Sequence, residues 1–174
     1  MKNQVFSCGL VDRLMAVLDI GNFDEDCFVE TPSSPKEIFN YLSWFSSQVN
    51  GGGVTQFYEV ILPAGFSFEA LFDSIRYIGN ARIQRDLREV HATVPIELRE
   101  IPRETEVPEQ LSDWALGISP GSEETKRLLD KLDSWAGDIL PWLKYQMTLL
   151  AFSDIDAFPK LKRAWEAEKK GLDI

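Results

Sequence analysis

Residues 34–53, SPKEIFNYLSWFSSQVNGGG, contain the clearest helix boundaries in the chain. Ser34 stands before a proline and three residues before Glu37, which is the capping-box pattern that satisfies free backbone N–H groups at a helix start. Apolar side chains then recur at three- and four-residue intervals and predict one buried face: Ile38, Tyr41, Leu42, Phe45 and Val49. Asn50 and the glycines after it stop the helix, because both residue types tolerate the left-handed conformation at a helix end.

The same helical spacing continues on both sides of this stretch. It predicts further helices over residues 6–18, 54–62, 68–78, 80–90, 122–135, 139–152 and 155–170. Residues 93–121 differ, because prolines interrupt them and proline cannot donate the backbone hydrogen bond of a helix interior. We expect an extended connector there, with one short helix near 109–116. The sequence therefore predicts an all-α fold: a single compact domain over residues 1–174, with seven or eight helices and a Pro-rich connector in the second half.

The charge balance is strongly acidic. The 174 residues include 28 Asp and Glu against 18 Lys and Arg, for a net charge of −10. Binding to a phosphate backbone requires clustered Lys and Arg, so we expect no direct contact with nucleic acid. The negative charge is concentrated in residues 1–75 and 104–138. Between these blocks lie four arginines that either pair with neighbouring carboxylates or contact an acidic partner or a second subunit: Arg76, Arg82, Arg85 and Arg88.

The rarest residues argue against several chemistries. His91, Cys8 and Cys27 are the chain's only histidine and cysteines, too few and too scattered for a structural zinc site. We expect no cofactor, two reduced thiols and a cytoplasmic location. The most hydrophobic window, residues 139–152, is too short to cross a bilayer, so we expect no membrane association. Nucleophilic catalysis would have to use His91, which we expect at the surface or capping a helix, so we predict that the protein is not an enzyme and name no catalytic residue.

Residues 44–58, WFSSQVNGGGVTQFY, carry a second kind of signal. Read from the residues alone they are structural: a tight reversal followed by aromatic side chains that enter the core. No Gly-Lys-Ser/Thr follows the glycines, which excludes a P-loop. The segment also resembles the signature of a bacterial family of small, acidic, all-helical DNA-mimic proteins. The residues that carry this resemblance are Asn50, Gly51, Gly52, Gln56, Phe57 and Tyr58.

The resemblance implies a homodimer that binds the DNA-binding face of a partner such as a transcriptional repressor. Carboxylates on a rigid scaffold would then stand in for DNA phosphates. The candidate contacts from the two acidic blocks are Asp24, Glu25, Asp26, Glu30, Glu104, Glu106, Glu109, Glu123, Glu124, Asp130 and Asp133. Two alternatives stay open. One is an immunity or antitoxin-type protein that neutralises a dedicated toxin, and the other is a small-ligand binder or enzyme with a pocket lined by aromatic residues.

Overall fold

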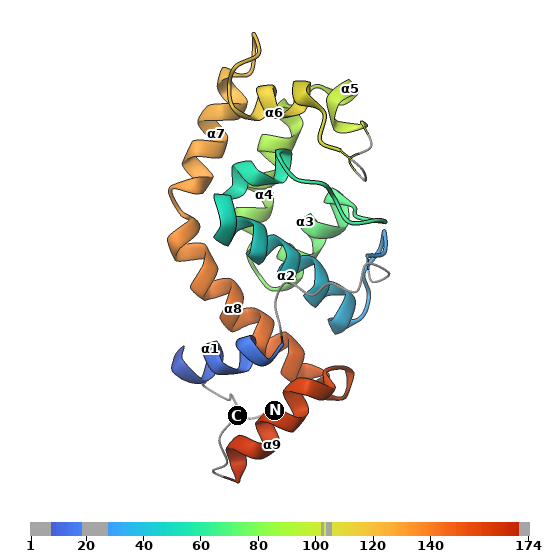
Figure 1. Ribbon diagram of the computed structural model, residues 1–174, viewed down its shortest axis with the longest axis vertical. Helices are drawn as coiled ribbons and strands as arrows, with labels where there is room; N and C mark the ends of the chain where they lie inside the picture. The colour runs from blue at the N-terminus through green and yellow to red at the C-terminus, as the bar shows by residue number, and fades with distance from the viewer. Residues whose placement is uncertain (1–7, 19–27, 102, 104–105, 171–174) are drawn as a thin grey trace.

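A computed structural model describes residues 8–18, 28–101, 103 and 106–170 of the chain (Figure 1). These residues form an all-α domain without strands, as predicted, and eight of its nine α-helices have seven residues or more. The α-helices are α1 (Cys8–Val17), α2 (Pro35–Gly52), α3 (Phe68–Tyr77), α4 (Ala81–Thr93), α5 (Ile96–Arg99), α6 (Glu109–Ala115), α7 (Glu123–Asp133), α8 (Ala136–Ser153) and α9 (Pro159–Lys169). Two 3₁₀ helices complete the set, η2 (Val54–Tyr58) and η3 (Ile155–Ala157).

The predicted capping box at the start of α2 is confirmed. The Ser34 hydroxyl accepts a hydrogen bond from the Glu37 backbone N–H at 3.3 Å, and the Glu37 carboxylate accepts one from the Ser34 N–H at 2.9 Å. Backbone hydrogen bonds from Ser33 and Ser34 lower the pKa of Glu37. The end of α2 differs from the prediction, because Asn50 and two glycines continue the helix and the chain turns only at Gly53, where φ is +76°.

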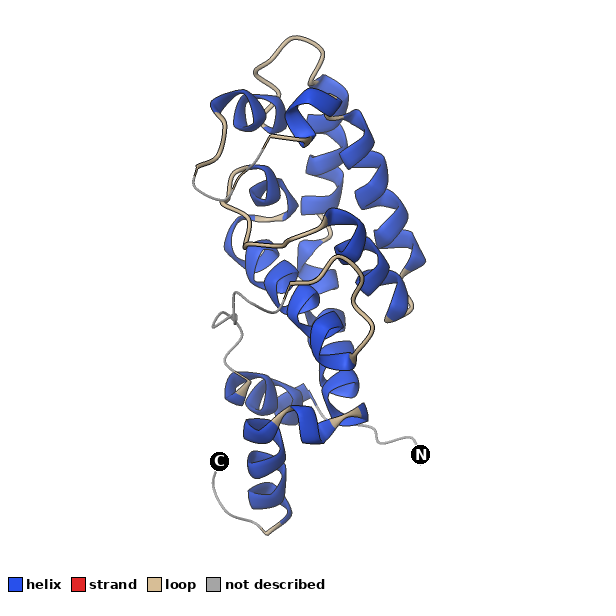
Figure 2. Ribbon diagram, turned by 90° about the vertical axis from the view of Figure 1, so that its right-hand side faces the viewer, coloured by secondary structure: helices blue, strands red, loops and turns tan. Residues whose placement is uncertain are grey.

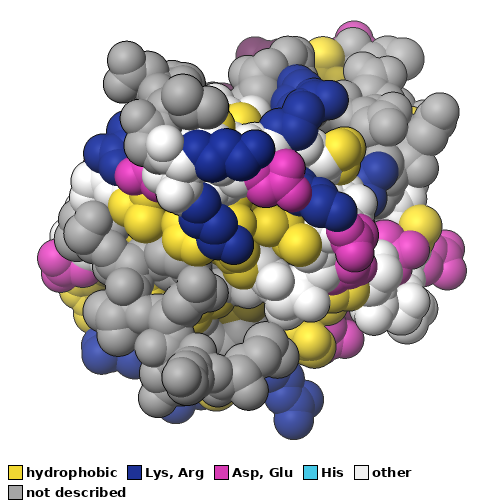
Figure 3. Space-filling view, turned by 90° about the horizontal axis from the view of Figure 1, so that it is seen from below, with side chains coloured by type: hydrophobic (Ala, Val, Ile, Leu, Met, Phe, Trp, Pro, Cys, Tyr) yellow, Lys and Arg dark blue, Asp and Glu magenta, His cyan; other side chains and the backbone are white. Residues whose placement is uncertain are grey.

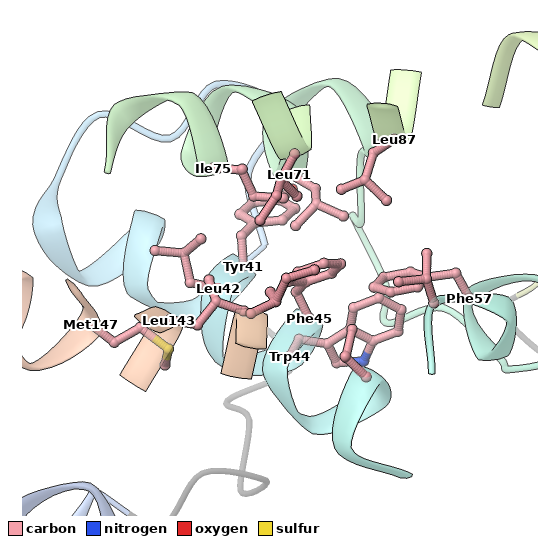
Figure 4. Packing of buried hydrophobic residues seen from close by; sticks show 14 of the residues in the cluster. Tyr41, Leu42, Trp44, Phe45, Phe57, Leu71, Ile75, Leu87, Leu143 and Met147 are labelled. Carbon is pink, nitrogen blue, oxygen red and sulfur yellow. The ribbon is translucent and has the colours of Figure 1, made fainter. Parts of the chain in front are cut away.

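The core lies where α2 crosses α8 and α3 (Figure 4). Tyr41, Leu42 and Phe45 of α2 are fully buried, and Leu143 and Met147 of α8 pack into the same cluster. Aromatic rings make up much of this core, and those of Tyr41 and Trp44 meet their neighbours edge-on or tilted, a geometry that ring quadrupoles favour. The buried face predicted for residues 34–53 is therefore the face that organises the domain.

The helices are arranged along one long axis (Figures 1 and 2). α7 and α8 follow one another down this axis. α5, α6 and the beginning of α7 form one end of the molecule, whereas α1 and α9 pack beside the end of α8 at the other. Viewed from the α1–α9 end, the surface shows Lys and Arg side chains around apolar ones, with carboxylates among them (Figure 3). None of the described helices is long and apolar enough to cross a bilayer.

Three predicted segments have different boundaries in the structure. The single helix expected over residues 155–170 is wrong, because Pro159 starts a new helix, α9, after the short η3. Proline suits the first position of a helix and cannot continue the one before it. The segment expected as a helix over 54–62 is the shorter η2. The connector over 93–121 holds the predicted helix at 109–115 and an additional one, α5.

Candidate partner-binding surface

One end of the molecule gathers exposed carboxylates from three elements. α5, α6 and the first turn of α7 meet there, because α5 contacts α6 and α6 contacts α7 (Figure 1). The exposed acidic residues at this end are Glu97, Glu100, Glu106, Glu109, Glu123 and Glu124. We call these six residues the acidic end. Glu124 is partly neutralised by an ion pair with Arg127 at 2.5 Å, whose hydrogen bonds lower the pKa of the Glu124 carboxyl.

The structure therefore brings four of the eleven predicted contact residues together: Glu106, Glu109, Glu123 and Glu124. Glu30 precedes the start of α2, away from this end. Asp130 is exposed on α7 and forms an ion pair with Lys126 one turn earlier. Asp133 is the last residue of α7, and its carboxylate accepts hydrogen bonds from residues of η2. The remaining four, Asp24, Glu25, Asp26 and Glu104, lie outside the described residues.

Exposed apolar side chains share this end with the carboxylates. Ile96 of α5 is 59% exposed, and Leu116 and Ile118, in the turn after α6, are 42% and 66% exposed. Half of the exposed large apolar side chains in the described part of the chain are thus found at the acidic end. Apolar anchors rimmed by polar groups are typical of a surface that another protein covers. The sequence analysis missed these residues, although the Leu116–Ile118 pair beside a glycine in the Pro-rich connector was a visible signal.

A buried hydrogen-bond network fixes α6 against α4 and α7. The indole N–H of Trp114 donates to the Thr125 hydroxyl at 2.8 Å, and the Thr93 hydroxyl lies 2.7 Å from the same oxygen. Thr125 is fully buried, so water does not compete for these bonds. The network gives the acidic end a rigid base built from three helices.

The motif that carries the family resemblance forms a compact structural unit. The side chain of Gln56 lies against Gly51 and Gly52, where a methyl group on either glycine would meet the Gln56 amide oxygen within 3 Å. Phe57 and Tyr58 follow and are buried. The glycines thus leave room for the Gln56 side chain to lie against the end of α2.

Asp133 locks this unit to the end of α7. Its carboxylate accepts hydrogen bonds from the Val54 backbone N–H and from the Thr55 hydroxyl, the latter at 2.6 Å. The free N–H groups at the start of η2 are therefore satisfied by a side chain 78 residues away in the chain. With its carboxylate occupied in this way, Asp133 contributes to the fold.

His91 is half-buried and packs against an aromatic cluster, at a position where the sequence predicted a surface or helix-capping role. Its ring stacks on Phe68 at 4.4 Å between centroids, and its Nδ1 lies 3.3 Å from the Tyr58 hydroxyl. Burial and, to a lesser extent, the positive charges of nearby arginines together lower the pKa of His91 to about 4. Burial also raises the pKa of Tyr58, so both groups are neutral near pH 7.

The four arginines between the two acidic blocks differ in their contacts. Arg88 pairs with Glu69 at 2.5 Å and Asp73 at 3.5 Å. Arg85 lies beside the buried carboxylate of Asp86 at 3.3 Å. The guanidinium of Arg82 stacks over Trp135 at 4.2 Å, and Arg76 is exposed without an ion pair to any described carboxylate.

A hollow of about 450 Å³ opens between the start of α4 and the start of α8. It is lined by Asn80, Arg82, Ile83, Trp135, Asp138, Ile139 and Trp142. The volume falls within the range of small-molecule sites, and two indole rings with a few polar groups are a common lining for one. The aromatic-lined pocket expected for a small-ligand binder would lie in this hollow.

No family model, curated protein or solved structure matches this chain.

Proposed function

We propose that the protein is an acidic binding protein whose α5–α6–α7 end occupies the basic, DNA-binding surface of a partner protein, such as a transcriptional repressor. The observation that supports this is the gathering of carboxylates and exposed apolar side chains on the same end of the molecule. Carboxylates attract a basic surface and orient the encounter, and the apolar side chains add contact area once water is excluded.

The ion pairs within α7 indicate which carboxylates are available to a basic partner. Glu124 and Asp130 are paired with Arg127 and Lys126, so their charge is partly cancelled on the surface. Glu106, Glu109 and Glu123 have no ion pair with a described cation. Charges without an internal partner are the ones that remain available for a basic surface.

The test replaces four carboxylates of the acidic end by amides: Glu97→Gln, Glu106→Gln, Glu109→Gln and Glu123→Gln. A matched control makes the same change in net charge elsewhere on the surface: Asp12→Asn, Glu59→Gln, Asp156→Asn and Glu166→Gln. Each protein is used as bait in a native lysate, with and without duplex DNA as competitor. We expect the wild type and the control to recover a DNA-binding protein that duplex DNA and moderate salt displace, and the acidic-end variant to lose it.

Two outcomes would contradict this function. Equal recovery by the acidic-end variant and the control would show that these carboxylates do not contact the partner. A single partner that DNA does not displace would instead favour the immunity alternative.

The hollow beside Trp135 supports a second candidate function, the binding of a small molecule. Its volume, its two indole rings and the polar groups of Asn80, Arg82 and Asp138 are the observations in favour. A thermal-shift screen with metabolites tests it, because a ligand that binds only the folded protein raises its melting temperature. The Trp142→Ala variant should lose such a shift if the ligand occupies this hollow.

A further inference from the structure

Arg103 is a buried cation that no carboxylate among the described residues pairs with. Only 4% of its surface is exposed, and burial lowers its pKa to about 10. One of its N–H groups donates to the carbonyl of Phe57, and its guanidinium carbon lies 5.2 Å from the ring centre of Phe68. No described carboxylate forms an ion pair with it. A buried charge is costly unless it is paired, and a guanidinium carries five donors, so this arrangement leaves most of its hydrogen-bonding capacity unused.

Arg99 is a second arginine nearby that forms no ion pair with a described carboxylate. It ends α5, close enough to influence both Tyr58 and His91 electrostatically, as Arg103 also does. Its Nε is buried and has no hydrogen-bond partner. Arg103 lies over the rings of Tyr58 and Phe68, and the charges of both arginines act on Tyr58 and His91.

The surrounding carboxylates do not balance this charge. Glu69 and Asp73 are both engaged by Arg88, the third arginine near His91. Glu97 and Glu100 adjoin Arg99 in the chain but are exposed to solvent, where their charge is screened. Because His91 is neutral near pH 7, two positive charges remain without a described counter-charge in a protein whose net charge is −10.

We propose that Arg99 and Arg103 form a binding site for a small oxyanion, either a phosphate or a carboxylate group. The forked donors of a guanidinium match the paired oxygens of both groups. The buried Nε of Arg99 and the unused donors of Arg103 supply the hydrogen bonds, and the rings of Tyr58 and Phe68 form the apolar side of the site. This site adjoins the acidic end, because Arg99 lies between Glu97 and Glu100 in the chain.

The single histidine of the chain makes the test specific, because its ring protons give one resolved set of NMR signals beside the proposed site. Sodium phosphate is titrated into the full-length protein at constant ionic strength, with sodium chloride as the reference salt. A second titration with sodium benzoate distinguishes a carboxylate site from a phosphate site. We expect a saturable shift of the His91 ring signals with one of the two anions and none with chloride.

Two variants show whether the arginines bind the anion. Arg99→Gln should weaken binding at least about tenfold, since it removes one set of charge-assisted hydrogen bonds. Arg76→Gln makes the same charge change at an exposed, unpaired arginine and should bind like the wild type. Circular dichroism confirms that both variants are folded. The proposal is overturned if neither anion shifts the His91 signals saturably, or if Arg99→Gln binds as tightly as Arg76→Gln.

Discussion

The carboxylate of Asp133 accepts a hydrogen bond from the hydroxyl of Thr55 at 2.6 Å, joining the end of α7 to the start of η2. The same carboxylate accepts the backbone N–H of Val54, so it works as a cap for a helix far away in the chain. This contact holds the Asn50–Tyr58 motif against the end of α7. The carboxylate of Asp133, which the sequence analysis named as a candidate partner contact, is therefore engaged within the fold.

Asp133→Ala should lower the free energy of unfolding by about 1–3 kcal/mol, because it leaves capped backbone N–H groups without an acceptor. Asp130→Ala is the control, since it removes an exposed carboxylate from the same helix. That variant should change stability by no more than about 0.5 kcal/mol. Urea unfolding of both proteins checks the difference. Equal midpoints would mean that the Asp133 cap contributes nothing.

Gly53→Ala should destabilise the protein more than Gly79→Ala. Both glycines have positive φ, at +76° and +91°, where an alanine costs roughly 1–2 kcal/mol from its backbone conformation alone. At Gly79 an added methyl group meets no atom within 4 Å, whereas at Gly53 it would lie 2.6 Å from the Asp133 carboxylate. Gly53 also has ψ near −172°, a region that only glycine occupies readily. Thermal unfolding should place Gly53→Ala clearly below Gly79→Ala, and the reverse order would refute the steric argument.

The half-buried His91 should make stability fall on acidification. Its pKa is about 4 in the folded state and near 6.5 in the unfolded chain, so the unfolded state binds the proton first as the pH drops. Above about pH 6.5 the titration of His91 does not reduce the free energy of unfolding. Toward pH 4 it lowers this free energy progressively, by on the order of 3 kcal/mol. His91→Phe removes this titration and keeps a ring against Phe68. Urea unfolding between pH 7 and 4 should show a shallower decline for the variant, and parallel curves would contradict the assignment.

Thr125→Val should lower stability by about 1–3 kcal/mol, because it leaves the indole N–H of Trp114 buried without an acceptor. Thr148→Val is a matched control at another fully buried threonine, whose hydroxyl bonds only to the Lys144 carbonyl in its own helix. We expect the control to cost much less. Chemical unfolding followed by tryptophan fluorescence measures both, and equal losses would show that the Trp114 bond carries no special weight.

Local patterns predicted the helices well where their signals lay within a few residues. The capping box at Ser34 and the apolar period after it gave the start of α2 and its buried face. Helix ends were harder, because Asn50 and its two neighbouring glycines can either continue a helix or stop it. Pro159 sets the start of the last helix. The apolar spacing continues across this proline, but the helix before it does not.

The candidate site could be predicted only in part, for an electrostatic reason. Net charge and its blocks along the chain can be counted from the residues, but whether a carboxylate is free depends on the cations that folding brings beside it. Glu123 and Glu124 are neighbours in sequence, and only Glu124 is paired with Arg127. Ile96 and Ile118 lie at the same end because α5 packs on α6, a contact without a signature in either segment.

The sequence by itself determined the all-α class, the approximate helix positions and the acidic character, because periodicity, capping and composition act over short distances in the chain. The tertiary structure alone decided which charges are exposed, which are paired and which are buried. It turned Asp133 into a helix cap, enclosed His91 among aromatic rings and left Arg99 and Arg103 without a described carboxylate. Each of these outcomes depends on burial and on partners far away in sequence, which set the local dielectric and the hydrogen bonds available to a group.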